Sequence, residues 1–249
     1  MKTFAIIGGS GLDQLGPLQI SARRSVITAY GAPSGPLCEG LFAGSPVIFL
    51  PRHGETHRIP PHLINYRANI AALKAAGVTS ILAVTAVGGI GPAAGPGRLV
   101  IPDQIIDYTY GREHTFADGT GNQVDHSEFT SPFSAALGQL LIDSAVDAGV
   151  EIVAGGVYGA TQGPRLETAA EIARMARDGC TLVGMTGMPE AALAREAGLD
   201  YAMVSLVVNW GAGIGGTAIS HAEIGHHLEH GMNAVLRLIG RALGSALSR

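Results

Sequence analysis

The sequence predicts an α/β fold in a single domain, residues 1–249. Short apolar runs typical of strands alternate with helical stretches along the chain, and this alternation is characteristic of α/β proteins. A chain of 249 residues can bury a large core, and none of its segments has the composition of a linker. One domain with one core is therefore expected.

Six strands are expected, each a short apolar run. They cover residues 4–7, 47–50, 81–84, 156–160, 182–185 and 201–208. A helix is expected over residues 63–76, because apolar residues recur there at intervals of three and four and Gly77 is a natural C-cap. Its apolar stripe consists of Leu63, Tyr66, Ile70 and Leu73.

Two later helices are indicated by the spacing of a capping box. Thr168 with Glu171 begins one of them, and Ser220 with Glu223 begins the last helix. Residues 109–132 are polar and rich in turn formers, so we expect a long excursion that covers a site or reaches a neighbouring subunit. The stripe of the last helix consists of Ile224, Leu228, Met232, Val235, Ile239 and Leu243.

Glycine and charge contents set the first limits on function. The 36 glycines among 249 residues are about 14 %, twice the usual share of roughly 7 %, and they lie between apolar runs, which suggests loops pressed against a ligand. Charged residues make up 14 %, against roughly 25 % in an average protein. Too few charges are present to cover a monomer, so we expect some surface to be buried between subunits.

Composition also excludes several classes of partner. A net charge of −4 provides no basic stripe for nucleic acid, and no run of 18 apolar residues could cross a membrane. Two cysteines are too few for a disulfide framework, and residues 1–3 lead directly into a strand instead of a secretory segment. A cytoplasmic protein is therefore expected.

Residues 8–11, Gly-Gly-Ser-Gly, follow the first expected strand, where backbone N–H groups can face an anion. A dinucleotide site is not favoured, because no third glycine follows and no acidic residue ends a second strand about 20 residues later. A turn that holds one phosphate, with the Ser10 hydroxyl as a further donor, fits better. A tight turn without a ligand is the alternative.

Two further strand ends carry groups suited to phosphate. Arg52 and His53 follow the second strand, where a parallel sheet collects its ligands, and the planar fork of arginine matches a phosphate dianion. The third strand ends with Thr85, Ala86 and Gly88, a hydroxyl and small residues that let backbone amides approach a ligand. A surface ion pair, a loop histidine and a plain glycine turn are the simpler alternatives.

Glu167 and Asn209 stand in unusual places for ordinary surface polar groups. Glu167 comes just before a capped helix, and Asn209 ends an apolar strand. A buried asparagine needs partners for its carbonyl and its amino group, and a purine edge can supply both.

The motifs IIGGSGL, RHG, NYRANI, TAVGGI, QGPRLET and GMTGMPEA together resemble the family of trimeric purine nucleoside phosphorylases and methylthioadenosine phosphorylases. They stand in the family's order and spacing over nearly the whole chain. The resemblance implies a mixed central sheet surrounded by helices, assembly as a homotrimer, and cleavage of a purine nucleoside by inorganic phosphate. It implies no metal and no organic cofactor.

The resemblance also assigns roles to residues of this sequence. Glu167 and Asn209 would act on the base during catalysis. Phosphate would be bound by Ser10, Arg52, His53, Thr85, Ala86 and Thr186. The nucleoside would be contacted by Val87, Gly88, Leu166, Met185, Asn209, Trp210, Gly211 and His221.

The base pocket differs from that of family members that act on 6-aminopurines, which carry aspartates where this chain has Asn209 and Gly211. Asparagine together with Glu167 is the pattern of members that cleave 6-oxopurine nucleosides. The chemistry agrees, because Glu167 can accept the proton on N1 while Asn209 donates to O6 and accepts from N7–H. Adenine would leave both side chains facing wrong partners, a penalty of several kcal/mol.

The 5′ substituent of the sugar is left open by the sequence. His221 falls where a histidine meets the 5′-hydroxyl in members that take ordinary ribonucleosides, whereas the RHG motif and the chain length resemble the methylthio-nucleoside branch. Methylthioinosine is the favoured substrate; inosine or guanosine and methylthioadenosine are the alternatives. Phosphate would attack C1′ of an oxocarbenium-like sugar.

Two interpretations from other classes are weaker. A non-catalytic nucleotide-binding module could share the fold, but a phosphate cradle and a purine-reading pair in one chain argue against it. His226 and His230 share a helical face, yet the pattern is not H-E-x-x-H and such residues on an amphipathic helix are usually solvated. No metal site is therefore expected.

Overall fold

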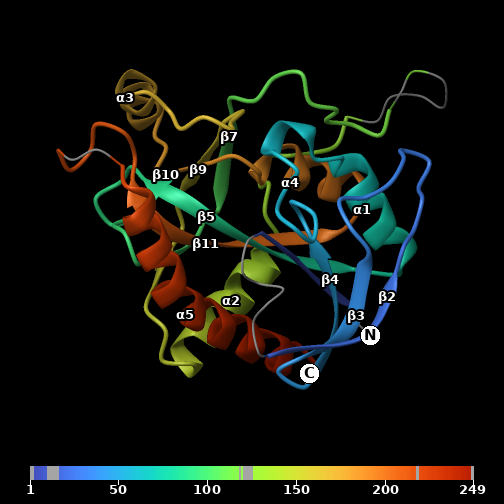
Figure 1. Cartoon of the computed structure of the whole chain (residues 1–249). Coiled ribbons are helices and arrows are strands. Elements are labelled where there is room, and N and C mark those ends of the chain that lie inside the picture. Colours follow the sequence, from blue (N-terminus) through green and yellow to red (C-terminus); the bar gives the residue numbers. More distant parts are fainter. Residues whose placement is uncertain (1–2, 10–16, 118, 120–125, 217–218, 248–249) are drawn as a thin grey trace.

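In the computed structural model, which describes residues 3–9, 17–117, 119, 126–216 and 219–247, eleven strands form one mixed sheet (Figure 1). The order is β2-β3-β4-β1-β5-β10-β9-β7, and β11, β6 and β8 continue from the other edge of β5. The strands are β1 (Phe4–Gly8), β2 (Leu18–Arg24), β3 (Leu37–Phe42), β4 (Ser45–Pro51), β5 (Ser80–Gly89), β6 (Leu99–Ile101), β7 (Gln104–Asp107), β8 (Ile152–Ala154), β9 (Val157–Ala160), β10 (Leu182–Gly184) and β11 (Asp200–Trp210).

The sheet is built around β5 and β11, its two longest strands, which are parallel along their whole length. β1 and β4 extend the parallel part, whereas β10 runs antiparallel to the end of β5. Residues 81–84 and 201–207 are buried on both faces, as expected for parallel strands covered by helices.

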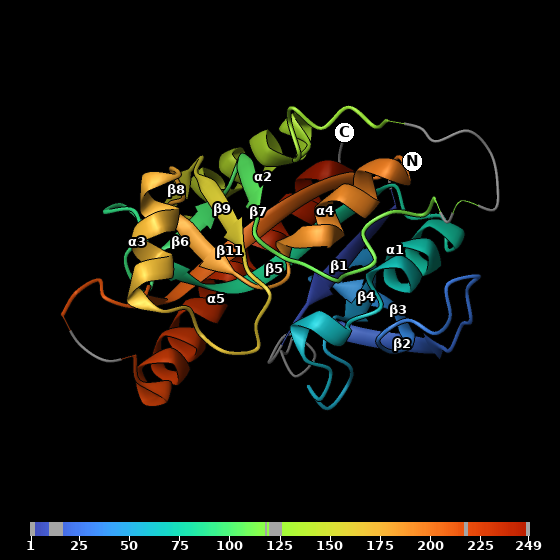
Figure 2. The same ribbon diagram turned by 90° about the horizontal axis from the view of Figure 1, so that it is seen from above.

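Helices cover both faces of this sheet (Figure 2). Two of them, α1 and α4, pack in one apolar cluster, while α2 and α5 pack in another cluster on the opposite face. A small third cluster lies beneath α3. The helices are α1 (Tyr66–Ala75), α2 (Ala135–Asp147), α3 (Ala169–Arg177), α4 (Gly187–Glu196) and α5 (His221–Leu247), with one 3-10 turn, η1 (Pro61–Leu63).

The predicted α/β class with a mixed central sheet is confirmed, and each of the six expected strands is present as β1, β4, β5, β9, β10 or β11. The expected helix over residues 63–76 begins later. Asn65 caps α1 by accepting from the Ala68 N–H, so Leu63 lies outside the helix and is 66 % exposed. The remaining apolar positions of that stripe are buried.

The capping box of α3 is confirmed, since the Thr168 hydroxyl accepts from the Glu171 N–H and the Glu171 carboxylate accepts from the Thr168 N–H. The last helix begins after Ser220, as expected. In the excursion at 109–132, the described residues form neither helix nor strand. In the described part of the chain, no helix is long and apolar enough to span a bilayer.

Candidate active site

A cavity of about 530 Å³ lies at an opening in the sheet beside β5. β1 pairs with residues 80–83 of this strand and β10 pairs with residues 88–89. Among the described strands, none pairs with that edge of β5 between these two stretches. Thr85, Ala86 and Val87 belong to this unpaired stretch of β5, and they line the cavity.

The cavity brings together eleven of the predicted site residues. They are Arg52, His53, Thr85, Ala86, Val87, Gly88, Leu166, Glu167, Met185, Thr186 and Asn209. Ser10 and the side chain of His221 lie outside the described part of the structure.

Two other predicted residues lie beside the cavity and do not line it. Trp210 lines a neighbouring cavity of about 220 Å³, which shares Asn209 with the larger one. Gly211 is buried, and its N–H donates to the carbonyl of Gly89.

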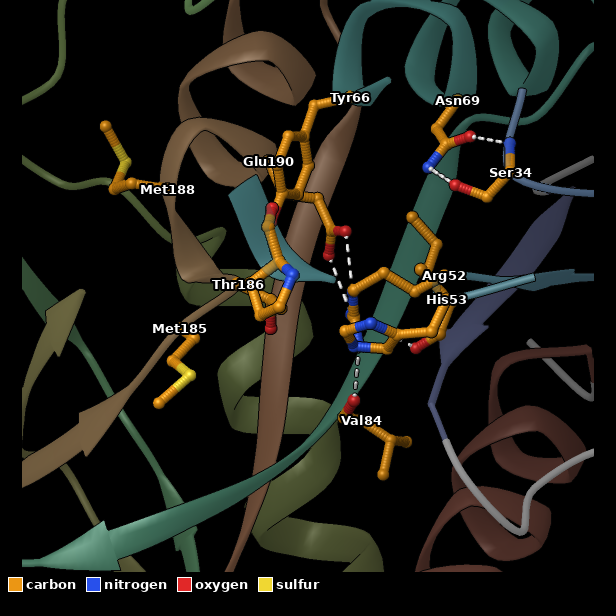
Figure 3. Close-up of polar contacts among 12 residues, drawn as sticks. Ser34, Arg52, His53, Tyr66, Asn69, Val84, Met185, Thr186, Met188 and Glu190 are labelled. Carbon is orange, nitrogen blue, oxygen red and sulfur yellow. Dashed lines mark hydrogen bonds and ion pairs between the residues drawn. The ribbon is translucent and has the colours of Figure 1, made fainter. Parts of the chain in front are cut away.

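Arg52 forms a buried ion pair that sequence reasoning missed (Figure 3). Its Nε and Nη2 donate to the two carboxylate oxygens of Glu190, each over 2.8 Å, and both side chains are at most 1 % exposed. Nη1 donates to the carbonyl of Val84 at 2.8 Å, and Nη2 also reaches the carbonyl of Ile7. A guanidinium has five N–H groups, so one, on Nη1, has no partner within the described residues.

The Glu190 carboxylate and burial together determine the protonation states of Arg52 and Tyr201. Burial lowers the pKa of Arg52, but the adjacent Glu190 carboxylate more than offsets this and raises the pKa above its ordinary value. The Tyr201 hydroxyl donates to Glu190 at 2.9 Å, and burial raises the pKa of Tyr201 well above its ordinary range. Arg52 is therefore a fixed cation, and Tyr201 stays a neutral donor.

His53 faces the same cavity as a neutral ring. Its Nδ1 lies 2.8 Å from the carbonyl of Ile59, which can only accept, so Nδ1 carries the proton and Nε2 is left as an acceptor. Burial lowers the pKa of His53 to about 4; the Ile59 carbonyl opposes this, and Arg52 and His57 lower the pKa further.

Two buried threonines supply hydroxyl groups. The Thr85 hydroxyl pairs with that of Ser205 on β11 at 3.0 Å. Thr186 precedes α4 but makes no side-chain cap, so its hydroxyl is not used by the helix. Together with Arg52 they give one end of the cavity the donors that an oxyanion requires.

Asn209 is directed into the cavity by a β-bulge. Val207 pairs with Val87 and Asn209 with Gly88, which leaves Val208 as an extra residue, and both Val208 and Asn209 line the cavity. Asn209 Nδ2 donates to the Trp210 carbonyl at 2.7 Å, and within the described residues this leaves one N–H and the side-chain carbonyl for a ligand.

Gly88 is required opposite Asn209. A Cβ at position 88 would lie 2.9 Å from Val183 Cγ1 and 3.4 Å from Asn209 Nδ2. Even an alanine there would therefore force Val183 to shift and would lie in contact with Asn209.

Glu167 lies on the loop between β9 and α3, and its orientation is set locally. The Thr161 hydroxyl donates to Glu167 Oε1 at 2.6 Å. This contact was not anticipated from the sequence, although the two residues are only six positions apart.

The apolar wall of the cavity comes from α5, which supplies Ile224, Leu228 and Met232. The sequence predicts these residues on the apolar stripe of the last helix, but not that they line a site. Since they are four residues apart, they lie on one helical face. The apolar face of α5 therefore packs in the core along part of its length and lines the cavity at these three residues.

Arg112 ties the excursion to the site. Its Nη1 donates to the carbonyls of Met185 and Met188, and its Nη2 to those of Thr161 and Gln162. The side chain is buried, so these carbonyls replace the water that the cation has lost. No signal in the sequence distinguished Arg112 from other arginines.

The described residues contain no group of three or more histidine, cysteine or acidic side chains arranged to hold a metal ion.

Comparisons with known proteins agree with this chemistry. The model of the family described as "Phosphorylase superfamily" matches residues 3–244. A probable S-methyl-5′-thioinosine phosphorylase of Pseudomonas syringae pv. tomato is 52 % identical over 99 % of this chain and 100 % of its own length. The 6-oxopurine nucleoside phosphorylase of Pyrococcus furiosus is 41 % identical over 98 % of this chain and 92 % of its own length.

Solved structures are similar over the whole chain. Methylthioadenosine phosphorylase from Schistosoma mansoni in complex with tubercidin has a TM-score of 0.91 and 32 % identity, covering 100 % of this chain and 93 % of that one.

Proposed function

The chain belongs to the phosphorylase superfamily, and we propose that it cleaves S-methyl-5′-thioinosine with inorganic phosphate to hypoxanthine and 5-methylthioribose 1-phosphate. One observation carries the proposal: a polar pair suited to a 6-oxopurine and an apolar helix face open into the same cavity. The relatives named for 6-oxopurines support the choice of base.

The base is held between Glu167 and Asn209. Glu167 Oε2 accepts from N1–H, the remaining N–H of Asn209 donates to O6, and its carbonyl accepts from N7–H. Negative charge moves into the purine as the glycosidic bond breaks, so the hydrogen bond from Asn209 to O6 strengthens in the transition state. N7 takes up the proton that phosphate gives up on forming its ester, and only then does the Asn209 carbonyl accept from N7–H. A 6-aminopurine presents an acceptor at N1 and meets Glu167 as acceptor against acceptor.

The 5′ substituent lies against the apolar face of Ile224, Leu228 and Met232. A methylthio group buries apolar surface there, whereas a hydroxyl would need a partner that these three side chains cannot give. This face favours the thioether over the ordinary ribonucleoside.

Phosphate occupies the end of the cavity formed by Arg52, His53, Thr85, Ala86 and Thr186. The free Nη1–H of Arg52 and the two hydroxyls donate to it. Because His53 offers an acceptor, the phosphate oxygen that meets Nε2 carries a proton. Phosphate then attacks C1′ of an oxocarbenium-like sugar, and no metal or organic cofactor takes part.

The test is phosphate-dependent base release from methylthioinosine, inosine and methylthioadenosine, compared as kcat/KM. Preference for methylthioinosine is expected. Preference for inosine would contradict the role of the α5 face, and preference for methylthioadenosine would contradict the roles of Glu167 and Asn209. Nucleoside binding without release of any base would identify a non-catalytic binding module.

We also propose that the protein is a cytoplasmic homotrimer. Three large apolar side chains, Leu63, Tyr110 and Leu166, are 66 %, 73 % and 42 % exposed, and contact with another subunit would cover them. Sedimentation equilibrium should give three times the mass of the chain, and cell fractionation should recover the activity in the cytosol. A monomeric mass would contradict the assembly.

A further inference from the structure

Thr161 holds the carboxylate of Glu167 in place, and we propose that through this contact it sets the preference for 6-oxopurines. The inference rests on the proposed function, because it takes Glu167 as the group that meets N1 of the base. Thr161 is a positioning residue in this role and does not line the cavity itself.

The hydroxyl of Thr161 has one proton and two nearby acceptors. Oγ1 lies 2.6 Å from Glu167 Oε1 and 3.3 Å from the carbonyl oxygen of Gly184. The shorter distance is that of a hydroxyl bound to a carboxylate, so the proton is donated to Glu167. Among the described residues, this is the one hydrogen bond that the Glu167 carboxylate receives.

Thr161 is itself anchored to the sheet. It directly follows β9, and its backbone N–H donates to the carbonyl of Gly184 at the end of β10 over 2.8 Å. Glu167 belongs to the loop that leads to α3. The hydroxyl thus fixes a loop carboxylate against the rigid ends of two strands, occupying Oε1 and leaving Oε2 for the purine.

A fixed acceptor discriminates between bases more strongly than a mobile one. A carboxylate that could turn away would lose its aligned contact with N1–H of a 6-oxopurine, whereas a 6-aminopurine has no proton at N1 and would lose no such contact. The tether prevents this loss. Removing it should lower activity on the oxopurine and leave activity on the aminopurine nearly unchanged.

The test is Thr161→Val, which has the same shape and no hydroxyl. We expect kcat/KM for methylthioinosine to fall about tenfold, the size of one hydrogen bond to a charged group, with most of the loss in kcat. The values for methylthioadenosine and the KM for phosphate should stay within about twofold, so the oxopurine-to-aminopurine ratio falls about tenfold. Thr161→Ser keeps the hydroxyl and should keep the ratio.

Thr181→Val is the matched control. Its hydroxyl bonds to the backbone of Val157 on the same sheet, and the residue does not line the cavity. Both substrates are assayed on one preparation, so partial unfolding lowers both rates and leaves the ratio unchanged. If Thr161→Val does not fold, Thr161→Ala removes the same hydroxyl.

The outcomes separate the two proposals. A wild-type protein without preference for 6-oxopurines would refute the proposed function, whatever the variants do. A wild-type preference that survives in Thr161→Val, or that is lost equally in Thr161→Ser, would overturn only the role of Thr161.

Discussion

Glu190→Gln should destabilise the protein more than any other isosteric change of a carboxylate in the described structure. Glu190 accepts two hydrogen bonds from Arg52 and one from Tyr201, and it is fully buried. Glutamine has the same shape, but its amide has only one oxygen. At least one of the three donors then faces an N–H₂ group, and the charge of Arg52 loses its counter-ion.

The expected cost follows from that geometry. Breaking a buried ion pair by removing one partner costs about 3–5 kcal/mol, because an uncompensated charge remains in the interior. For a chain of this length each kcal/mol lowers Tm by roughly 2–4 °C. We therefore expect a fall of about 10 °C in Glu190→Gln.

The assay is thermal unfolding followed by circular dichroism, at pH 7 and at one protein concentration, because subunit association would make Tm depend on concentration. The control is Glu151→Gln, which removes the partner of Arg98 in a pair whose side chains are 53 % and 85 % exposed. That pair should contribute less than about 1 kcal/mol. Equal shifts in the two variants would refute the argument from burial.

Three other predictions concern the residues that line the cavity. Because burial lowers the pKa of His53 to about 4, the unfolded chain binds more protons below pH 6.5, so stability should fall between pH 6.5 and 4 by up to about 1.4 kcal/mol per pH unit. Urea unfolding at pH 7 and pH 5 should show a smaller loss in His53→Asn, and an equal loss would contradict the assignment. Asn209→Asp should shift kcat/KM from methylthioinosine towards methylthioadenosine by at least about tenfold, and an unchanged ratio would show that Asn209 does not read the base. Leu228→Asn should lower kcat/KM for methylthioinosine about tenfold and for inosine less; parallel losses would mean that α5 does not meet the 5′ group.

Much of the cavity could be predicted because its residues stand at strand ends. Arg52 follows β4 and Asn209 lies near the end of β11. Thr85 was expected at a strand end but lies in the middle of β5, just beyond the stretch that pairs with β1. In α/β sheets, ligands gather at the carboxyl ends of the strands, so polar side chains directly after apolar runs are recognisable from a single sequence.

The partners of these residues could not be predicted, because each pairing depends on the tertiary fold. Glu190 is 138 positions from Arg52 and stands in an apolar segment where it resembles an ordinary charge in the first turn of a helix. The stripe of α5 shows the same limit. The helical period predicts that Leu228 and Met232 lie on the apolar face of the last helix. It does not predict whether that face packs on the sheet or lines a cavity.

The Arg52–Glu190 ion pair satisfies backbone carbonyls that the opening in the sheet would otherwise leave without hydrogen bonds. A ligand can enter beside β5 only where β5 lacks a neighbouring strand, and an opening in a buried sheet leaves backbone carbonyls without partners. Arg52 donates to the carbonyl of Ile7, near the end of β1, and to that of Val84, the first position of β5 beyond the stretch paired with β1. A buried arginine in that place requires a counter-ion, which Glu190 supplies from α4. The same guanidinium satisfies a carbonyl of β1 and one of β5 and keeps one N–H on Nη1 without a partner among the described residues. We therefore propose that the anion binds at this opening, where the division of the sheet places the cation.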